Sequence, residues 1–140
     1  MVGGFKDIYG GETTVARLWR WIIDLKKGTV SEEQLDDGAC DFPRINDKLI
    51  GLKSKYGYCM QLKTDVEDLT FGEHLFKYHL ESGKRTDHHL GTNVAGGEPV
   101  FASKPEPSCE DEGWILSLVH ERETRQSKLV IIDAQAFDQE

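Results

Sequence analysis

The sequence lacks an excess of basic residues. Its 17 Lys and Arg are outnumbered by 25 Asp and Glu, and the 140-residue chain carries a net charge of −8 at pH 7. The basic residues are scattered along the chain instead of forming the continuous stripe that binds phosphate backbones. This composition argues against a nucleic-acid partner.

Long hydrophobic runs are missing as well. The apolar stretches Trp114 to Val119 and Leu129 to Ile132 are far shorter than the roughly 20 residues that a membrane-spanning helix needs. The first residues also lack the basic and then apolar pattern of a secretory leader. We therefore expect a cytoplasmic protein.

Cysteine is scarce. Cys40, Cys59 and Cys109 form no Cys-x-x-Cys pair, and none has a histidine nearby at metal-site spacing. A catalytic cysteine needs a neighbouring base, whereas small buried thiols need none. Free thiols in a reducing compartment are therefore the better interpretation.

The remaining composition is that of one small folded unit. Hydrophobic residues make up 38% of the chain, and a domain of this length buries about 70% of the surface of its unfolded chain. Met1 to Thr14 carries four of the 14 glycines and shows no alternation. We expect residues 1–15 to be poorly ordered and residues 16–140 to form the folded unit.

Alternating apolar and polar residues predict three β-hairpins. They are Val15 to Asp24 with Thr29 to Leu35, His74 to Leu80 with Arg85 to Leu90, and Trp114 to His120 with Lys128 to Asp133. Gly28 and Gly83 each end a Leu-x-x-Gly turn, and they are 55 positions apart. Hairpins at such spacing are typical of propeller blades, so we predict an all-β partial β-propeller.

Polar or glycine-rich stretches separate these hairpins and predict loops. They are Asp36 to Gly38, Lys53 to Lys55, Thr92 to Gly97, and the proline-containing Lys104 to Ser108.

The five histidines do not predict a metal site. His88 and His89 are adjacent and point to opposite faces of a strand, as do His74 and His79, while His120 stands alone. We interpret the His88-His89 pair as a solvated strand end.

Two carboxylates stand in restricted backbone positions. Glu98 lies between Gly97 and Pro99, where a proline holds its predecessor extended and a glycine permits close approach of the chain. Asp41 precedes Phe42-Pro43 and has the same restriction. An exposed turn acid is the ordinary interpretation of either residue, and their joint occurrence makes a shared function worth considering.

Several motifs together resemble a known family. They are Asp41 to Ile45, Lys55 to Tyr58, Gly97 to Phe101, the acidic Glu110 to Gly113 and the apolar Trp114 to Val119. Their order resembles the C-terminal third of the carotenoid oxygenases, which include lignostilbene and apocarotenoid cleavage dioxygenases. The resemblance covers roughly Ala16 to Phe137 and implies blades of a seven-bladed propeller.

The resemblance also implies a function. Family members bind a non-haem Fe²⁺ through four histidines and place both atoms of O₂ across an alkene of a carotenoid, apocarotenoid or stilbene. It implies that Glu98 and Asp41 accept the free ring N–H of iron-bound histidines. Glu98 matches directly, whereas Asp41 replaces the usual glutamate and is one methylene shorter. Ser103-Lys104-Pro105 departs from the family pattern.

By the same resemblance, the iron histidines lie outside this chain. The third is expected before Met1 and the fourth after the equivalent of Asp133 to Phe137. We therefore expect no catalytic residue in this chain and no iron bound by this chain alone. Any contact with a membrane surface is expected only through parts of the intact protein that this chain does not contain. Three explanations of such a chain stay open, namely a truncated reading frame, a gene remnant and an excised segment.

An excised arc of a propeller exposes faces that neighbouring blades otherwise cover. We expect self-association through apolar residues at risk of exposure, namely Trp19, Trp21, Phe76, Trp114 and Leu118. The alternative function is a non-catalytic β module that acts by association with another chain.

Overall fold

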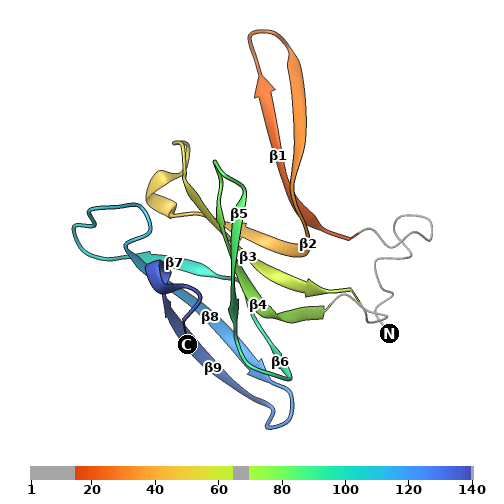
Figure 1. Cartoon of the computed structure of the whole chain (residues 1–140), viewed down its shortest axis with the longest axis vertical. Coiled ribbons are helices and arrows are strands. Elements are labelled where there is room, and N and C mark those ends of the chain that lie inside the picture. The colour runs from red at the N-terminus through yellow and green to blue at the C-terminus, as the bar shows by residue number, and fades with distance from the viewer. Residues whose placement is uncertain (1–14, 65–69, 140) are drawn as a thin grey trace.

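The computed structural model describes residues 15–64 and 70–139, and these residues form two antiparallel β-sheets. The five-stranded sheet has the order β1 (Arg17–Asp24), β2 (Thr29–Arg44), β3 (Tyr56–Lys63), β4 (Thr70–His79) and β5 (Lys84–His89). The four-stranded sheet contains β6 (Val94–Ala95), β7 (Val100–Ser103), β8 (Gly113–Glu121) and β9 (Gln126–Asp133) (Figure 1). Short 3-10 helices are η2 (Asp47–Leu49) and η3 (Ala134–Ala136). The all-β prediction is confirmed. The expected disorder of residues 1–15 falls almost entirely outside the described residues.

All three predicted hairpins are present and share one turn geometry. In each hairpin the backbone N–H of the last turn residue donates to the carbonyl oxygen of the residue four positions earlier. These hydrogen bonds are Gly28 to Asp24 (2.8 Å), Gly83 to His79 (2.9 Å) and Arg125 to Glu121 (2.9 Å). The donor residue has a positive φ in each case, 65°, 71° and 56°. Glycine adopts this conformation freely, which explains the two Leu-x-x-Gly motifs, while Arg125 adopts it at a cost.

The predicted loop at Asp36 to Gly38 is wrong, because β2 continues through it. Between the pairs Arg17↔Ala39 and Trp19↔Gln34, β2 has three more residues than β1, so these residues form a bulge. The Asp36 carboxylate accepts the backbone N–H of Gly38 and closes the bulge locally. The predicted loop Thr92 to Gly97 likewise contains the two-residue strand β6, which pairs with β8.

The main core lies between the two sheets. It joins β3 and β4 of the first sheet to β8, β9 and η3 of the second, through Tyr58, Met60, Leu75, Leu90, Val94, Phe101, Ile115, Val119, Ile132, Ala134 and Phe137. Lys77 reaches across the same interface. Its Nζ lies 2.7 Å from Asp111 Oδ2 and 2.6 Å from the Ala134 carbonyl oxygen.

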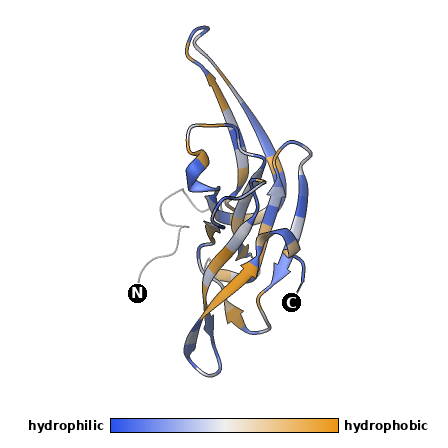
Figure 2. Ribbon diagram, turned by 90° about the vertical axis from the view of Figure 1, so that its left-hand side faces the viewer, coloured by the Kyte–Doolittle hydropathy of each residue, from blue (hydrophilic) through white to orange (hydrophobic). Residues whose placement is uncertain are grey.

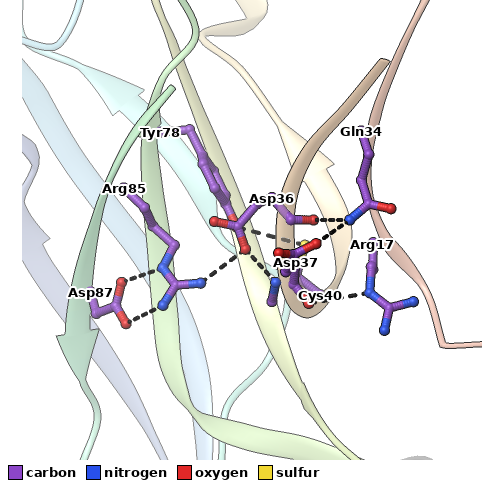
Figure 3. A network of polar contacts seen from close by, with 9 residues as sticks. Arg17, Gln34, Asp36, Asp37, Cys40, Tyr78, Arg85 and Asp87 are labelled. Atoms are coloured by element: carbon purple, nitrogen blue, oxygen red, sulfur yellow. Dashed lines mark hydrogen bonds and ion pairs between the residues drawn. The ribbon is translucent and has the colours of Figure 1, made fainter. Parts of the chain in front are cut away.

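A smaller cluster covers the opposite, outer face of the five-stranded sheet. It consists of Cys40, Cys59, Phe76 and Tyr78, all buried. The expected exposure of Phe76 is therefore wrong: only 3% of it is accessible, because the Arg85 guanidinium covers its ring at 4.4 Å from the centroid. Arg85 also contacts Asp36 and Asp87, as Figure 3 shows. Cys40, Cys59 and Cys109 are free thiols, as predicted, and Cys109 is exposed.

The β1–β2 hairpin projects beyond the rest of the molecule (Figure 1). Its strands carry exposed apolar residues, with Trp21 61% and Ile23 64% accessible, and Figure 2 shows hydrophobic residues on this projection. The predicted exposure of Trp19, Trp21, Trp114 and Leu118 is confirmed. Among the described residues, no helix has the length and apolar character required to cross a membrane.

Candidate functional site

The loop that carries Glu98 runs between β6 and β7 and approaches its neighbours closely. A Cβ on Gly97 would lie 2.7 Å from the backbone oxygen of Leu118, and a Cβ on Gly96 would lie 2.7 Å from the Met60 sulfur. Neither position accommodates a side chain without movement of its neighbours, which explains the Gly96-Gly97 pair.

Two further contacts fix this loop. The Ser117 hydroxyl, buried on β8, accepts the Gly97 N–H at 3.2 Å and donates to the Gly97 carbonyl oxygen at 3.0 Å. Pro99 is fully buried on the other side of Glu98. The backbone of Glu98 is therefore fixed on both sides, by the hydrogen bonds of Gly97 and by the buried Pro99.

Glu98 forms an ion pair with Arg44, at the end of β2. Arg44 Nη1 donates to Glu98 Oε1 at 3.0 Å, and Arg44 Nη2 lies 3.4 Å from both carboxylate oxygens of Asp47. The side chains are partly accessible, 34% for Arg44 and 43% for Glu98. This contact joins the Asp41-to-Ile45 motif to the Gly97-to-Phe101 motif across 54 positions of sequence.

Asp41 lies on the same strand but in a different environment. It is exposed, and its Oδ1 accepts the backbone N–H of Phe42 at 2.7 Å. Phe42 has a φ of 55°, so the residue before Pro43 is left-handed instead of extended as predicted. The pairing of β2 with β3 shifts between Asp41 and Arg44, and this irregularity permits the left-handed residue.

The structure thus links the two predicted motifs through Arg44, which the sequence reasoning did not single out. In the described part of the chain, Arg44 and not Asp41 bonds to Glu98. The repeated acid-proline context identified the two carboxylates. The basic partner of Glu98, Arg44, could be recognised in the sequence only as the arginine of the Phe-Pro-Arg motif.

The described histidines do not form a complete metal centre. Within residues 15–64 and 70–139, no group of three or more His, Cys, Asp and Glu side chains is placed to hold an ion. The predicted solvated strand end is wrong for His88, which is buried and whose Nδ1 donates to the Phe137 carbonyl oxygen at 2.8 Å. His74 and His89 also face each other across β4 and β5, a contact that the spacing of histidines along a single strand does not indicate.

These sheets and motifs define a class of protein. The chain has the fold of part of a β-propeller of the carotenoid oxygenase type. It belongs to the RPE65 family, described as retinal pigment epithelial membrane protein, whose family model matches residues 4–139.

Comparison with individual proteins agrees with this family. The chain is 29% identical over 133 residues to the apocarotenoid-15,15'-oxygenase of Synechocystis, covering 95% of this chain and 27% of that protein. It is 28% identical to lignostilbene-alpha,beta-dioxygenase isozyme III of Sphingomonas paucimobilis, covering 93% and 30%.

The crystal structure of cobalt-substituted Synechocystis apocarotenoid oxygenase, a seven-bladed propeller, matches with a TM-score of 0.78 and 30% identity. The match covers 86% of this chain and 25% of that one. The chain therefore spans about a quarter of the length of the relatives it matches.

Proposed function

We propose that this chain is a segment of an iron(II)-dependent dioxygenase that cleaves an alkene bond of a carotenoid, an apocarotenoid or a stilbene with O₂. The family and the names of the relatives support this class of reaction. The observation that carries the proposal is the Arg44–Glu98 ion pair, which joins the two motifs of the resemblance at one place in the fold.

The role we propose for Glu98 is to orient a metal-ligating histidine from another part of the intact protein. Arg44 bonds to Oε1, so Oε2 is available to accept a ring N–H. A carboxylate in this position fixes the tautomer of the histidine and raises its basicity as a ligand. We propose that Asp41 supports a second histidine, with Oδ2 as the acceptor because Oδ1 is bonded to Phe42.

The described residues do not fit the iron itself. They offer no cluster of three ligating side chains, so we assign no step of the oxygen chemistry to them. We propose that the chain by itself neither holds iron tightly nor cleaves a polyene or stilbene, because an oxygen-reactive iron site needs more protein ligands.

A chimera tests the role of Glu98. The matching segment of the Synechocystis apocarotenoid-15,15'-oxygenase is replaced with this chain, and iron content and apocarotenoid cleavage are measured. We expect Glu98→Gln to lower iron affinity or turnover about 10 to 100-fold, because the amide keeps the shape but loses the charge. Glu106→Gln, which changes an exposed carboxylate in the loop after β7, serves as the matched control and should change neither.

Equal iron content and turnover in the Glu98→Gln chimera and its parent would return Glu98 to the role of an exposed turn acid. If the chimera is insoluble, the same Glu-to-Gln change at the matching position of the intact relative gives the same test.

The second candidate function is a non-catalytic β module that associates with another chain. The projecting hairpin favours it, because Trp21, Ile22 and Ile23 are consecutive and all at least 60% accessible, so none of the residues that the structure describes covers either face of the ribbon. At its base is a cavity of about 440 Å³, lined in part by Leu18, Trp19 and Arg44. Such a surface fits an apolar partner segment.

A further inference from the structure

Two histidines lie side by side on the outer face of the five-stranded sheet. His74 of β4 and His89 of β5 are directly opposite in the antiparallel register, and their ring centroids are 4.9 Å apart. They are 15 positions apart in the sequence, so strand pairing alone brings them together. His89 is exposed and His74 half-buried, which leaves the pair open to an ion from solvent.

Gln61 fixes the tautomer of His74. Its Oε1 accepts the backbone N–H of Glu73 at 3.1 Å, which identifies this atom as the amide oxygen. His74 Nδ1 lies 3.1 Å from the same oxygen and must donate to it. The ring proton is therefore on Nδ1, and Nε2 carries the free lone pair.

The surroundings also disfavour the protonated form of His74. Burial, and then the neighbouring His89, lower the pKa of the His74 ring below its ordinary value. A ring with one nitrogen bonded to an amide oxygen and a lone pair on the other has the arrangement of a metal-ligating histidine.

We propose that His74 and His89 together bind a divalent transition-metal ion such as Ni²⁺ or Zn²⁺, each through one ring nitrogen. With metal–nitrogen bonds of about 2.0 to 2.1 Å, two rings on one ion have centroids roughly 4.5 Å apart at the right angle that Ni²⁺ prefers and roughly 5 Å apart at the tetrahedral angle of Zn²⁺. The observed 4.9 Å lies between these two spacings. Imidazole suits both ions, and water completes the coordination.

The site has two protein ligands. Asp87 lies two residues before His89 on the same face, but Arg85 donates to both of its carboxylate oxygens, at 2.8 and 3.2 Å. No third ligand joins the pair in the described part of the chain. The site is thus weaker than a closed four-ligand zinc centre, and it is independent of the proposed dioxygenase function.

Calorimetric titration of the metal-free chain with Ni²⁺ tests the proposal. Ni²⁺ is used because Cu²⁺ would oxidise the exposed thiol of Cys109. We expect one ion per chain, with affinity reduced about tenfold or more in His89→Gln and in His74→Gln, since each change removes a ligand. His120→Gln, at an exposed histidine of β8, is the matched control and should bind like the parent.

A second measurement uses the paramagnetism of Ni²⁺. The NMR signals of the His74 and His89 rings should broaden, while those of His120 stay sharp. Unfolding in urea should abolish binding, because it separates the two strands. Unchanged affinity in His89→Gln, which alters an exposed side chain and retains the fold, would overturn the proposal, as would equal binding by the urea-unfolded chain.

Discussion

At the scale of single residues, the turn of the β8–β9 hairpin contains a residue in a costly conformation. Arg125 has a φ of 56°, whereas Gly28 and Gly83 occupy the corresponding positions of the other two hairpins. The left-handed region costs an L-residue about 1 to 2 kcal/mol, and glycine avoids most of this cost. The identity of this one residue therefore affects the stability of the turn.

We predict that Arg125→Gly raises the free energy of unfolding by about 0.5 to 1 kcal/mol, because the relief of backbone strain exceeds the added entropy of the unfolded chain. Urea denaturation measures the change. Gly83→Ala is the reciprocal control. Its added Cβ meets no neighbour within 4 Å, so a decrease of similar size in the free energy of unfolding would be due to backbone strain alone. A less stable Arg125→Gly variant would show that the arginine side chain contributes more than the strain costs.

At the scale of elements, the β1–β2 hairpin differs from the strands below it. Among residues 15–64 and 70–139, β1 pairs only with β2, and its apolar residues near the tip are exposed. A two-stranded ribbon without a covered face is marginally stable in water. The hairpin therefore depends on its turn and its cross-strand contacts, and its apolar side chains add little to the folded state of this chain.

We predict that Ile23→Thr changes the free energy of unfolding by less than about 0.5 kcal/mol, since Ile23 is 64% accessible. The same substitution at Ile115, which is fully buried in β8, should cost about 2 to 4 kcal/mol, because it removes apolar contacts and buries a hydroxyl. Chemical denaturation of the two variants provides the comparison. Equal losses would mean that the hairpin is packed against another part of the molecule.

At the scale of the whole molecule, the Lys77–Asp111 ion pair ties the two sheets together. Both side chains are nearly buried, 12% and 11% accessible, and Lys77 Nζ also lies 4.4 Å from the centroid of the Tyr56 ring. A buried charge that loses its partner is strongly destabilising, whereas a neutral replacement of both partners is often tolerated.

We therefore predict that Asp111→Ala costs about 3 to 5 kcal/mol of unfolding free energy, and that the double variant Lys77→Met/Asp111→Leu recovers much of this loss. Thermal and urea denaturation measure both. A loss below 1 kcal/mol in Asp111→Ala would show that Lys77 finds solvent or the Ala134 carbonyl oxygen sufficient.

The outer face of the four-stranded sheet leads to a prediction about assembly. Leu118, Leu129 and Ile131 are 67%, 54% and 60% accessible and lie on the paired strands β8 and β9. We predict that the chain self-associates through this face, because contiguous apolar surface is seldom left in water. Sedimentation should show oligomers that Leu118→Lys reduces, with Lys128→Glu, on the same sheet, as the control. A monomer that unfolds cooperatively at an ordinary temperature would contradict this and favour the independent β module.

Local sequence patterns predicted much of this architecture. The three hairpins follow from alternation, and their turns follow from glycine or from a run of polar residues, all of which act within a few residues. The exposed tryptophans follow instead from the architecture, because an excised arc of a propeller lacks the neighbouring blades. The pattern failed where a distant contact decided the outcome: Arg85 covers Phe76, and the β1–β2 pairing absorbs Asp36 to Gly38 as a bulge. The local pattern predicts a solvated His88, whereas the Phe137 carbonyl that accepts its N–H lies 49 positions away and is invisible to that pattern.

The sequence by itself determined the three hairpins with their turns and the carotenoid oxygenase family, because these depend on local conformational preferences and on motifs that stand intact in the chain. Only the tertiary structure decided which side chains meet. The Arg44–Glu98 pair, the opposed His74 and His89, and the Lys77–Asp111 link each join residues from separate strands or loops. Strand register and sheet packing set those contacts, and both arise from the summed burial of the whole chain.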